Sequence, residues 1–225
     1  MTLPLADASD MFVVHTMFRR EFGSVPGLVR GVAAGDERRA EVVAGHVALI
    51  NGVLHHHHAG EDAHVWPRLL ERVPEKLKPL VAVMEEQHEA IHKSSRQLGD
   101  ALEAWRATAS AQARDALAET VEQLLPALTE HLALEEEHVV PLIEQYVTAE
   151  EYRRLTEEGS ADTPPDQLPT IFGMLMYEGE PQAIDRIVSE MPPEIQPVIK
   201  DLAAKAYAAY AAELYGTATP PRVTG

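Results

Sequence analysis

Two stretches of the chain, 74 residues apart, carry the same unusual combination of side chains. Two histidines, a glutamate and a proline recur in one register. The matched pairs are His57 and His131, Glu61 and Glu135, His64 and His138, and Pro67 and Pro141. Four matches at one offset seldom arise by chance and indicate an internal repeat. A chain with two copies of one helical hairpin is expected to pair them about an approximate two-fold axis, and this constrains the fold more than any other feature.

The rest of the sequence predicts helices and no sheet. Ala, Leu, Glu, Arg and Gln dominate, apolar residues return every three or four positions, and alternating β-branched runs are missing. We expect long helices over about 7–22, 37–72, 77–107 and 110–147, the first ending at the Gly- and Pro-containing stretch 23–27. Their short connections predict an all-α, up-down-up-down four-helix bundle over residues 1–158. An accessory C-terminal region, 159–225, is expected to hold a linker and helices near 168–178, 181–190 and 194–215.

The charge and the composition narrow the classes of partner and cofactor. Among 225 residues, 36 Asp and Glu against 19 Lys and Arg give a net charge of −17. Because a nucleic acid or an anionic membrane needs a basic face, we expect neither as a partner. With no cysteine, iron–sulfur clusters and thiolate zinc sites are excluded, and any metal ligand must be His, Asp or Glu. No signal-type start and no apolar run of the roughly 20 residues that a membrane span requires are present, so we expect a cytoplasmic protein.

The spacing of the repeated residues places them on one face of each helix. At about 100° per residue, positions i, i+4 and i+7 lie within roughly 60° of one another, so His57 and Glu61 converge, as do His131 and Glu135. His88 and His92 are also one turn apart. His58 and Glu136 lie out of phase with these sets and are the rival assignments. The side chains that we expect to bind metal are His15, His57, Glu61, His88, His92, His131 and Glu135.

These seven side chains favour two metal ions over one. Polar groups left unsatisfied in a helical core cost about 1–3 kcal/mol each, and a bound cation compensates for that cost. One ion accepts four to six ligands, whereas this set is larger. Imidazole mixed with carboxylate suits iron, manganese, copper or zinc. Two bridging glutamates would leave room for a shared oxo or hydroxo group and an open position.

The ordered set of residues resembles the hemerythrin family, and in particular its bacterial HHE cation-binding proteins. The resemblance covers about residues 7–147: His15, then HxxxE at 57–61 with Trp-Pro after it, HxxxH at 88–92, and HxxxE at 131–135 followed by Pro141. It implies a four-helix bundle around two non-haem iron ions that bind dioxygen, peroxide or nitric oxide. The histidines would be the terminal ligands, and Glu61 and Glu135 the bridging carboxylates. A glutamate four residues after the last histidine favours the HHE type over the marine oxygen carriers.

Several alternatives stay open from the sequence. ExxH at Glu61–His64 and Glu135–His138 also matches the pattern of ferritin-like di-iron carboxylate proteins, although it leaves the other histidines unexplained. The iron centre is expected to turn over peroxide or reduce nitric oxide in stress defence, or to act as a reversible oxygen or iron sensor or carrier. A structural zinc bundle would leave several ligands idle. The sequence predicts neither the oligomeric state nor the role of the C-terminal helices.

Overall fold

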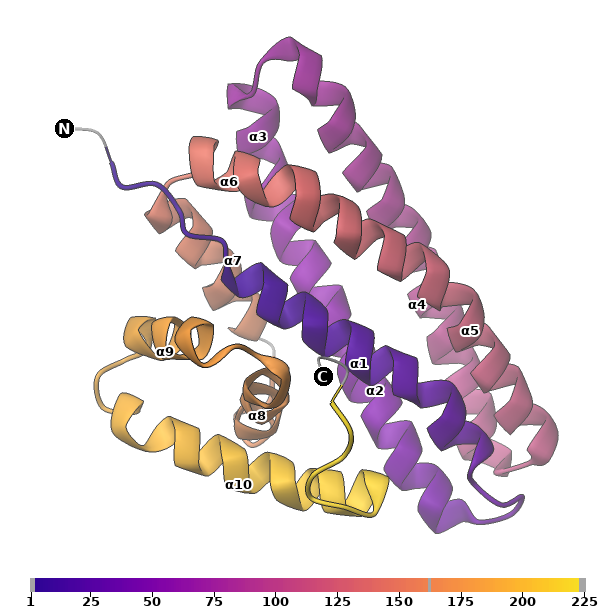
Figure 1. Ribbon diagram of the computed structural model, residues 1–225. Coiled ribbons are helices and arrows are strands. Elements are labelled where there is room, and N and C mark those ends of the chain that lie inside the picture. The colour runs from indigo at the N-terminus through magenta and orange to yellow at the C-terminus, as the bar shows by residue number, and fades with distance from the viewer. Residues whose placement is uncertain (1–2, 162, 223–225) are drawn as a thin grey trace. The chain divides into compact units, whose positions relative to one another are not determined.

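The computed structural model describes residues 3–161 and 163–222, and their regular structure is helical, with one isolated β-bridge between Leu5 and Thr148. The protein is therefore all-α, as predicted (Figure 1). Of the described residues, 3–8 and 22–161 form a first compact unit, and 9–21 and 163–222 form a second. The domain boundary predicted at residue 158 stays a prediction. None of the described helices combines the length and apolar character that a membrane span needs.

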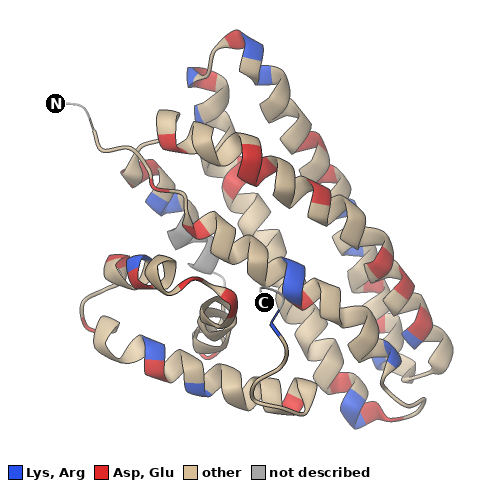
Figure 2. Ribbon diagram, in the orientation of Figure 1, with Lys and Arg blue, Asp and Glu red and all other residues tan. Residues whose placement is uncertain are grey.

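Three long helices dominate the first unit. They are α2 (Glu37–His64), α4 (Lys78–Thr108) and α5 (Ala111–Leu134), and they run back and forth beside one another (Figure 1). Side-chain caps start two of them: Asp36 accepts a hydrogen bond from the backbone N–H of Arg39 at 3.0 Å, and Ser110 accepts one from that of Ala113 at 3.2 Å. Most of α5 is uncharged in Figure 2, and most of the charged residues that it does carry are acidic. The complete four-helix up-down-up-down arrangement stays a prediction, because α1 (Asp10–Arg30) is shared between the units.

The internal repeat is visible in the helix boundaries. A seven-residue helix follows each HxxxE segment: α3 (Trp66–Arg72) after α2, and α6 (Val140–Tyr146) after α5 and a short π-helix, η2 (Glu135–Val139). Both ends of α6 lie 74 residues after those of α3, and each helix has its proline near the start. Proline is tolerated there because its missing N–H is not needed in the first turn. The structure therefore repeats the unit that the sequence repeats.

Two sequence predictions about helix ends are wrong. The first helix does not end at residue 23 but continues through Pro26 to Arg30. Phe22, Val25 and Val29 are fully buried at helical spacing, and their packing outweighs the cost of an internal proline. The second miss is α7 (Ala149–Ala161), which extends into the expected linker. Residue 162, also part of that linker, lies outside the described residues.

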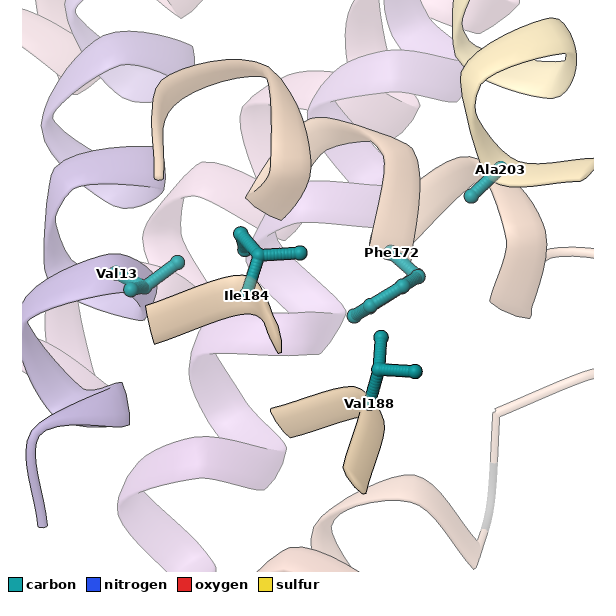
Figure 3. Close-up of a cluster of buried hydrophobic side chains, with 5 residues drawn as sticks. All are labelled: Val13, Phe172, Ile184, Val188 and Ala203. Atoms are coloured by element: carbon teal, nitrogen blue, oxygen red, sulfur yellow. The ribbon is translucent and has the colours of Figure 1, made fainter. Parts of the chain in front are cut away.

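The second unit packs residues 10–21 of α1 with α8 (Leu168–Glu178), α9 (Pro181–Glu190) and α10 (Gln196–Tyr215). In the first unit, the 3-10 turn η1 (Glu75–Leu77) connects α3 to α4. Figure 3 shows the apolar core of the second unit, formed by Val13, Phe172, Ile184, Val188 and Ala203. All four helical segments contribute to this core. The accessory helices predicted near 168–178, 181–190 and 194–215 are thus present.

Candidate metal centre

Three buried histidines from three helices of the first unit converge. His58 on α2, His88 on α4 and His131 on α5 each offer a ring nitrogen, and these atoms lie within 4.8 Å of one another. The rings of His58 and His88 stack with centroids 4.1 Å apart, and the ring of His131 stands edge-on to both. All three residues are at most 6% exposed. Neutral imidazoles in this arrangement are suited to bind a borderline-hard cation.

Hydrogen bonds fix which nitrogen of two of these rings is available. The Nδ1–H of His88 donates to Asp62 Oδ1 at 2.7 Å, and Asp62 is held in turn by Trp66 Nε1 at 2.8 Å. The Nδ1–H of His131 donates to Gln87 Oε1 at 3.1 Å. Both rings then present an Nε2 lone pair, the tautomer that metal-binding histidines adopt when a carboxylate or carbonyl orients them.

The two available nitrogens face each other at the spacing of two ligands of one ion. His88 Nε2 and His131 Nε2 are 3.1 Å apart. Two nitrogens about 2.1 Å from a common metal, at a right angle, are separated by about 3.0 Å. Two lone pairs at this distance repel unless a proton or a metal ion lies between them. The donor set therefore fits a bound metal ion.

Two buried glutamates complete the donor groups of the first unit. Ligand atoms of His57, Glu61 and Glu135 lie within 4.8 Å of one another, and both glutamates have no exposed surface. Glu61 has one oxygen on each side: Oε1 is 3.2 Å from His57 Nε2, and Oε2 is 3.5 Å from His88 Nε2. Glu135 Oε2 is 3.6 Å from His131 Nε2. The two carboxylate oxygens of Glu61 therefore approach both donor groups, one oxygen near His57 and the other near His88.

The helix carrying the second HxxxE segment is distorted at this point. Its α-helical pattern gives way to the π-helix η2 at Glu135, and π-turns often occur at functional sites. Glu136, the rival to Glu135, is out of phase with His131 in a regular helix, so it would need a distorted helix or a long reach to bind the same ion. The helix is distorted here, yet the glutamate that belongs to a donor group is Glu135 and not Glu136. His138, in the same segment, has a side chain that is 43% exposed and lies 3.8 Å from Glu137.

Five of the seven predicted ligands belong to the two donor groups within the first unit. The five are His57, Glu61, His88, His131 and Glu135. His92 is in neither donor group: its ring stacks on His55 at 5.1 Å, and Arg96 approaches its Nδ1 at 3.4 Å. His15 belongs to residues 9–21 of the second unit and stays a predicted ligand. His58, the rival to His57, joins His88 and His131, so the two adjacent histidines occupy different donor groups.

The comparison with known families agrees with this geometry. The hemerythrin HHE cation-binding domain matches the chain over residues 8–143 and again over 80–161. The chain belongs to the hemerythrin HHE cation-binding family. No curated protein and no solved structure matches it. Both matches of the HHE domain include His88, His131 and Glu135, so the family assignment and the buried donor groups support metal binding through the same segments.

The additional helix α7 packs against α2 beside the donor groups. Its Leu155 packs against Gly60 on α2, next to Glu61, where an added Cβ would be only 2.9 Å from the leucine Cδ1. Glycine therefore permits the close approach of α7. A capping box starts the helix: Glu151 Oε2 accepts a hydrogen bond from the N–H of Thr148 at 3.0 Å, and Thr148 Oγ1 accepts one from the N–H of Glu151 at 3.3 Å. The T-x-x-E sequence was the signal for this missed helix.

The sequence did not identify Gln87 and Asp62 as residues that orient the ligand histidines. Gln87 has no distinguishing sequence signal, because a single glutamine on a helix is common. Asp62 directly follows the HxxxE segment in the sequence, but its role in orienting His88 depends on the three-dimensional contact between α2 and α4. At the same helix pair, partial burial together with His92 and His56 lowers the pKa of His55.

Proposed function

We propose that the protein holds two iron ions and that this centre binds or turns over a small oxygen or nitrogen species such as peroxide, dioxygen or nitric oxide. The observation that carries the proposal is the placement of Glu61, with one carboxylate oxygen near His57 and the other near His88. A bridging carboxylate between two nitrogen sets is what a pair of ions requires. The proposed ligands are His15, His57, His58, Glu61, His88, His131 and Glu135.

The residues of this chain have separable roles in such a centre. Asp62 and Gln87 keep the Nδ1 atoms of their histidines protonated, so that the Nε2 atoms bind. Glu61 and Glu135 supply the negative charge that offsets two cations in a buried site. Leu155 and its helix exclude water beside Glu61. When bound, iron supplies the redox chemistry and the position at which the small ligand reacts.

The metal content of the purified chain tests the centre directly. Elemental mass spectrometry on untagged protein purified without chelator should find about two irons per chain. Glu61→Gln keeps the size of the side chain but removes its charge, and it should lower the content to about one or none. His138→Gln alters an exposed histidine of the same repeat and should leave the content unchanged. Near-zero iron, or about one zinc, in the unaltered protein would contradict the proposal.

A second experiment separates turnover from reversible binding. Sustained oxygen evolution from peroxide by the iron-loaded protein, lost in Glu61→Ala, would establish an enzyme that acts in oxidative stress. A visible absorption band that appears in oxygen and disappears under vacuum would instead establish a carrier or sensor. The cysteine-free composition means that the chain forms no disulfides, which fits a reducing compartment, and a cytoplasmic setting is part of the proposal.

A further inference from the structure

A pocket of about 270 Å³ opens between α2 and α4, beside the candidate metal centre. Its lining includes His58 and His88, which also belong to the buried donor group. The same two imidazoles therefore face the pocket and the centre, so only one layer of side chains separates them. Both residues are buried, whereas Glu85 and Glu89, also part of the lining, are exposed. The pocket thus leads from exposed carboxylates to buried ligands.

The charge of the lining selects for cations. Three carboxylates line the pocket and no lysine or arginine does. One of them, Asp62, is engaged by His88 and Trp66. Glu85 and Glu89 are four residues apart on α4, so they share a face, and neither forms an ion pair with another described residue. Clefts lined by one sign of charge concentrate ions of the opposite sign and accelerate their arrival.

The interior of the pocket contains a polar group that calls for a partner. Ser95 is only 7% exposed and lines the pocket, and its hydroxyl makes no hydrogen bond with any described residue. Its Oγ is reached by solvent through the pocket, so water or a ligand there satisfies it. Six waters at about 30 Å³ each occupy about 180 Å³, so the cavity has room for a hydrated divalent ion that could satisfy Ser95.

We propose that this pocket is the port through which a divalent metal ion reaches the centre. Glu85 and Glu89 hold the hydrated ion weakly at the mouth, and the ion exchanges its waters for the nitrogens of His58 and His88 at the inner wall. His92 lines the port without acting as an outer ligand, because Arg96 approaches its Nδ1. This proposal rests on the proposed metal centre.

The test compares the rate of metal loading with the final amount bound. Apoprotein is mixed with Fe²⁺ under anaerobic conditions at low ionic strength, and the quenching of Trp66, which contacts His88, is followed by stopped flow. Glu85→Gln combined with Glu89→Gln should slow loading about tenfold and leave the final iron content unchanged. The matched control combines Glu86→Gln with Glu130→Gln, which removes two exposed charges of the same unit outside the pocket lining, and it should load at the unaltered rate.

Salt provides an independent check, because screening should reduce the difference between the two double variants. Equal loading rates for the two double variants would overturn the port. A lower final iron content in the Glu85 and Glu89 variant would also overturn it, because these residues would then be ligands of the resident centre. If the unaltered protein binds no iron, the proposed function fails and the port fails with it, whereas normal iron content with equal rates rejects the port alone.

Discussion

Each of the two compact units buries a cluster of ionisable side chains, and the two clusters balance their charge in different ways. In the second unit, Arg20 contacts both carboxylates of its cluster: it pairs with Glu21, and its Nε lies 2.8 Å from Glu178 Oε1. The hydroxyl of Tyr215 donates to Glu21 Oε2 at 2.6 Å. Burial raises the pKa of Glu21, and the adjacent guanidinium opposes that rise. This cluster carries its own cation.

In the first unit, the buried carboxylates are next to histidine rings and not next to a guanidinium, as they are in the second unit. Glu61 and Glu135 are surrounded by imidazoles, and His88 and His131 direct ring nitrogens at each other at 3.1 Å. The contrast teaches that burial of polar groups alone does not identify a ligand site. The distinguishing feature is whether the chain itself supplies the positive charge.

Removing the internal cation should damage the second unit most. Arg20→Met leaves Glu21 and Glu178 buried without the guanidinium that contacts both, and such a change costs about 3–5 kcal/mol. Urea denaturation, followed through the tyrosine fluorescence of α10, measures the loss. The control is Arg154→Met, which removes an exposed pair with Glu150 and should cost at most about 1 kcal/mol. Similar losses in both variants would contradict the internal role of Arg20.

Removing the external cation should affect the first unit. Metal at about 100 times its dissociation constant stabilises a protein by about 2.7 kcal/mol, so a chelator should lower the denaturation midpoint reported by Trp66 and Trp105. Glu61→Gln should abolish most of this chelator effect, because Glu61 lies between the two nitrogen sets. A midpoint that is indifferent to chelator in the iron-loaded protein would show that the histidine cluster, like the arginine cluster, is complete without a metal.

Each unit has a glycine at a close contact between helices, and the closest neighbouring atoms include backbone in one case and belong to a flexible side chain in the other. At Gly173 of α8, an added Cβ would lie 2.5 Å from the backbone oxygen of Ala203 and 2.5 Å from Tyr207 Cβ. Gly173→Ala should therefore cost about 1–3 kcal/mol by overpacking. In Gly60→Ala the only contact closer than an ordinary van der Waals distance is with the flexible end of Leu155, at 2.9 Å. Because that side chain can rotate, the substitution should change the unfolding free energy by less than about 1 kcal/mol. Thermal denaturation of both variants measures the difference, and an equal cost would contradict it.

The smallest effect concerns pH. Hydrogen bonds from Arg72, assisted by Thr148, lower the pKa of Glu151 from 4.5 to about 2. Because the folded-state pKa is depressed, its stabilising contribution is complete above pH 4.5 and is lost as the pH falls towards 2. Solvent screening limits this contribution to about 1 kcal/mol or less. Glu151→Gln should flatten the pH dependence of the unfolding free energy in that window, and an unchanged profile would refute the assignment.

Local signals determined which parts of the fold could be predicted. The bounds of α8 and α9 agree with the sequence analysis, since each helix has a proline near its first turn. The end of α1 was predicted wrongly at Pro26, because a local helix-breaking signal does not report the burial of Val25 before the proline and Val29 after it. The helix α7 was predictable from Thr148 and Glu151, whose spacing matches a capping box.

The sequence predicted which residue types form the candidate site, but not which histidines share a donor group or which residues orient them. Helical phase alone made His57 and His58 rivals, because adjacent residues differ by about 100° in direction. Two donor groups can use both, one on each side of Glu61. The orienting contact from Gln87 to His131 depends on how α4 packs against α5, and no spacing within one helix encodes that. His92 satisfied the spacing rule and still lies in neither group.

The π-helix at 135–139 shows that the two copies of the repeat differ in backbone shape although they have the same length. The segment EEEHV there and its counterpart EDAHV at 61–65 have equal length, although the first is a π-helix and the second is the end of α2 before a break at Val65. After a duplication, the two copies would have kept the number of residues and diverged in backbone shape. A graft that exchanges these five residues therefore needs no insertion or deletion, and it would reveal whether the π-turn is encoded locally or imposed by the helices around it.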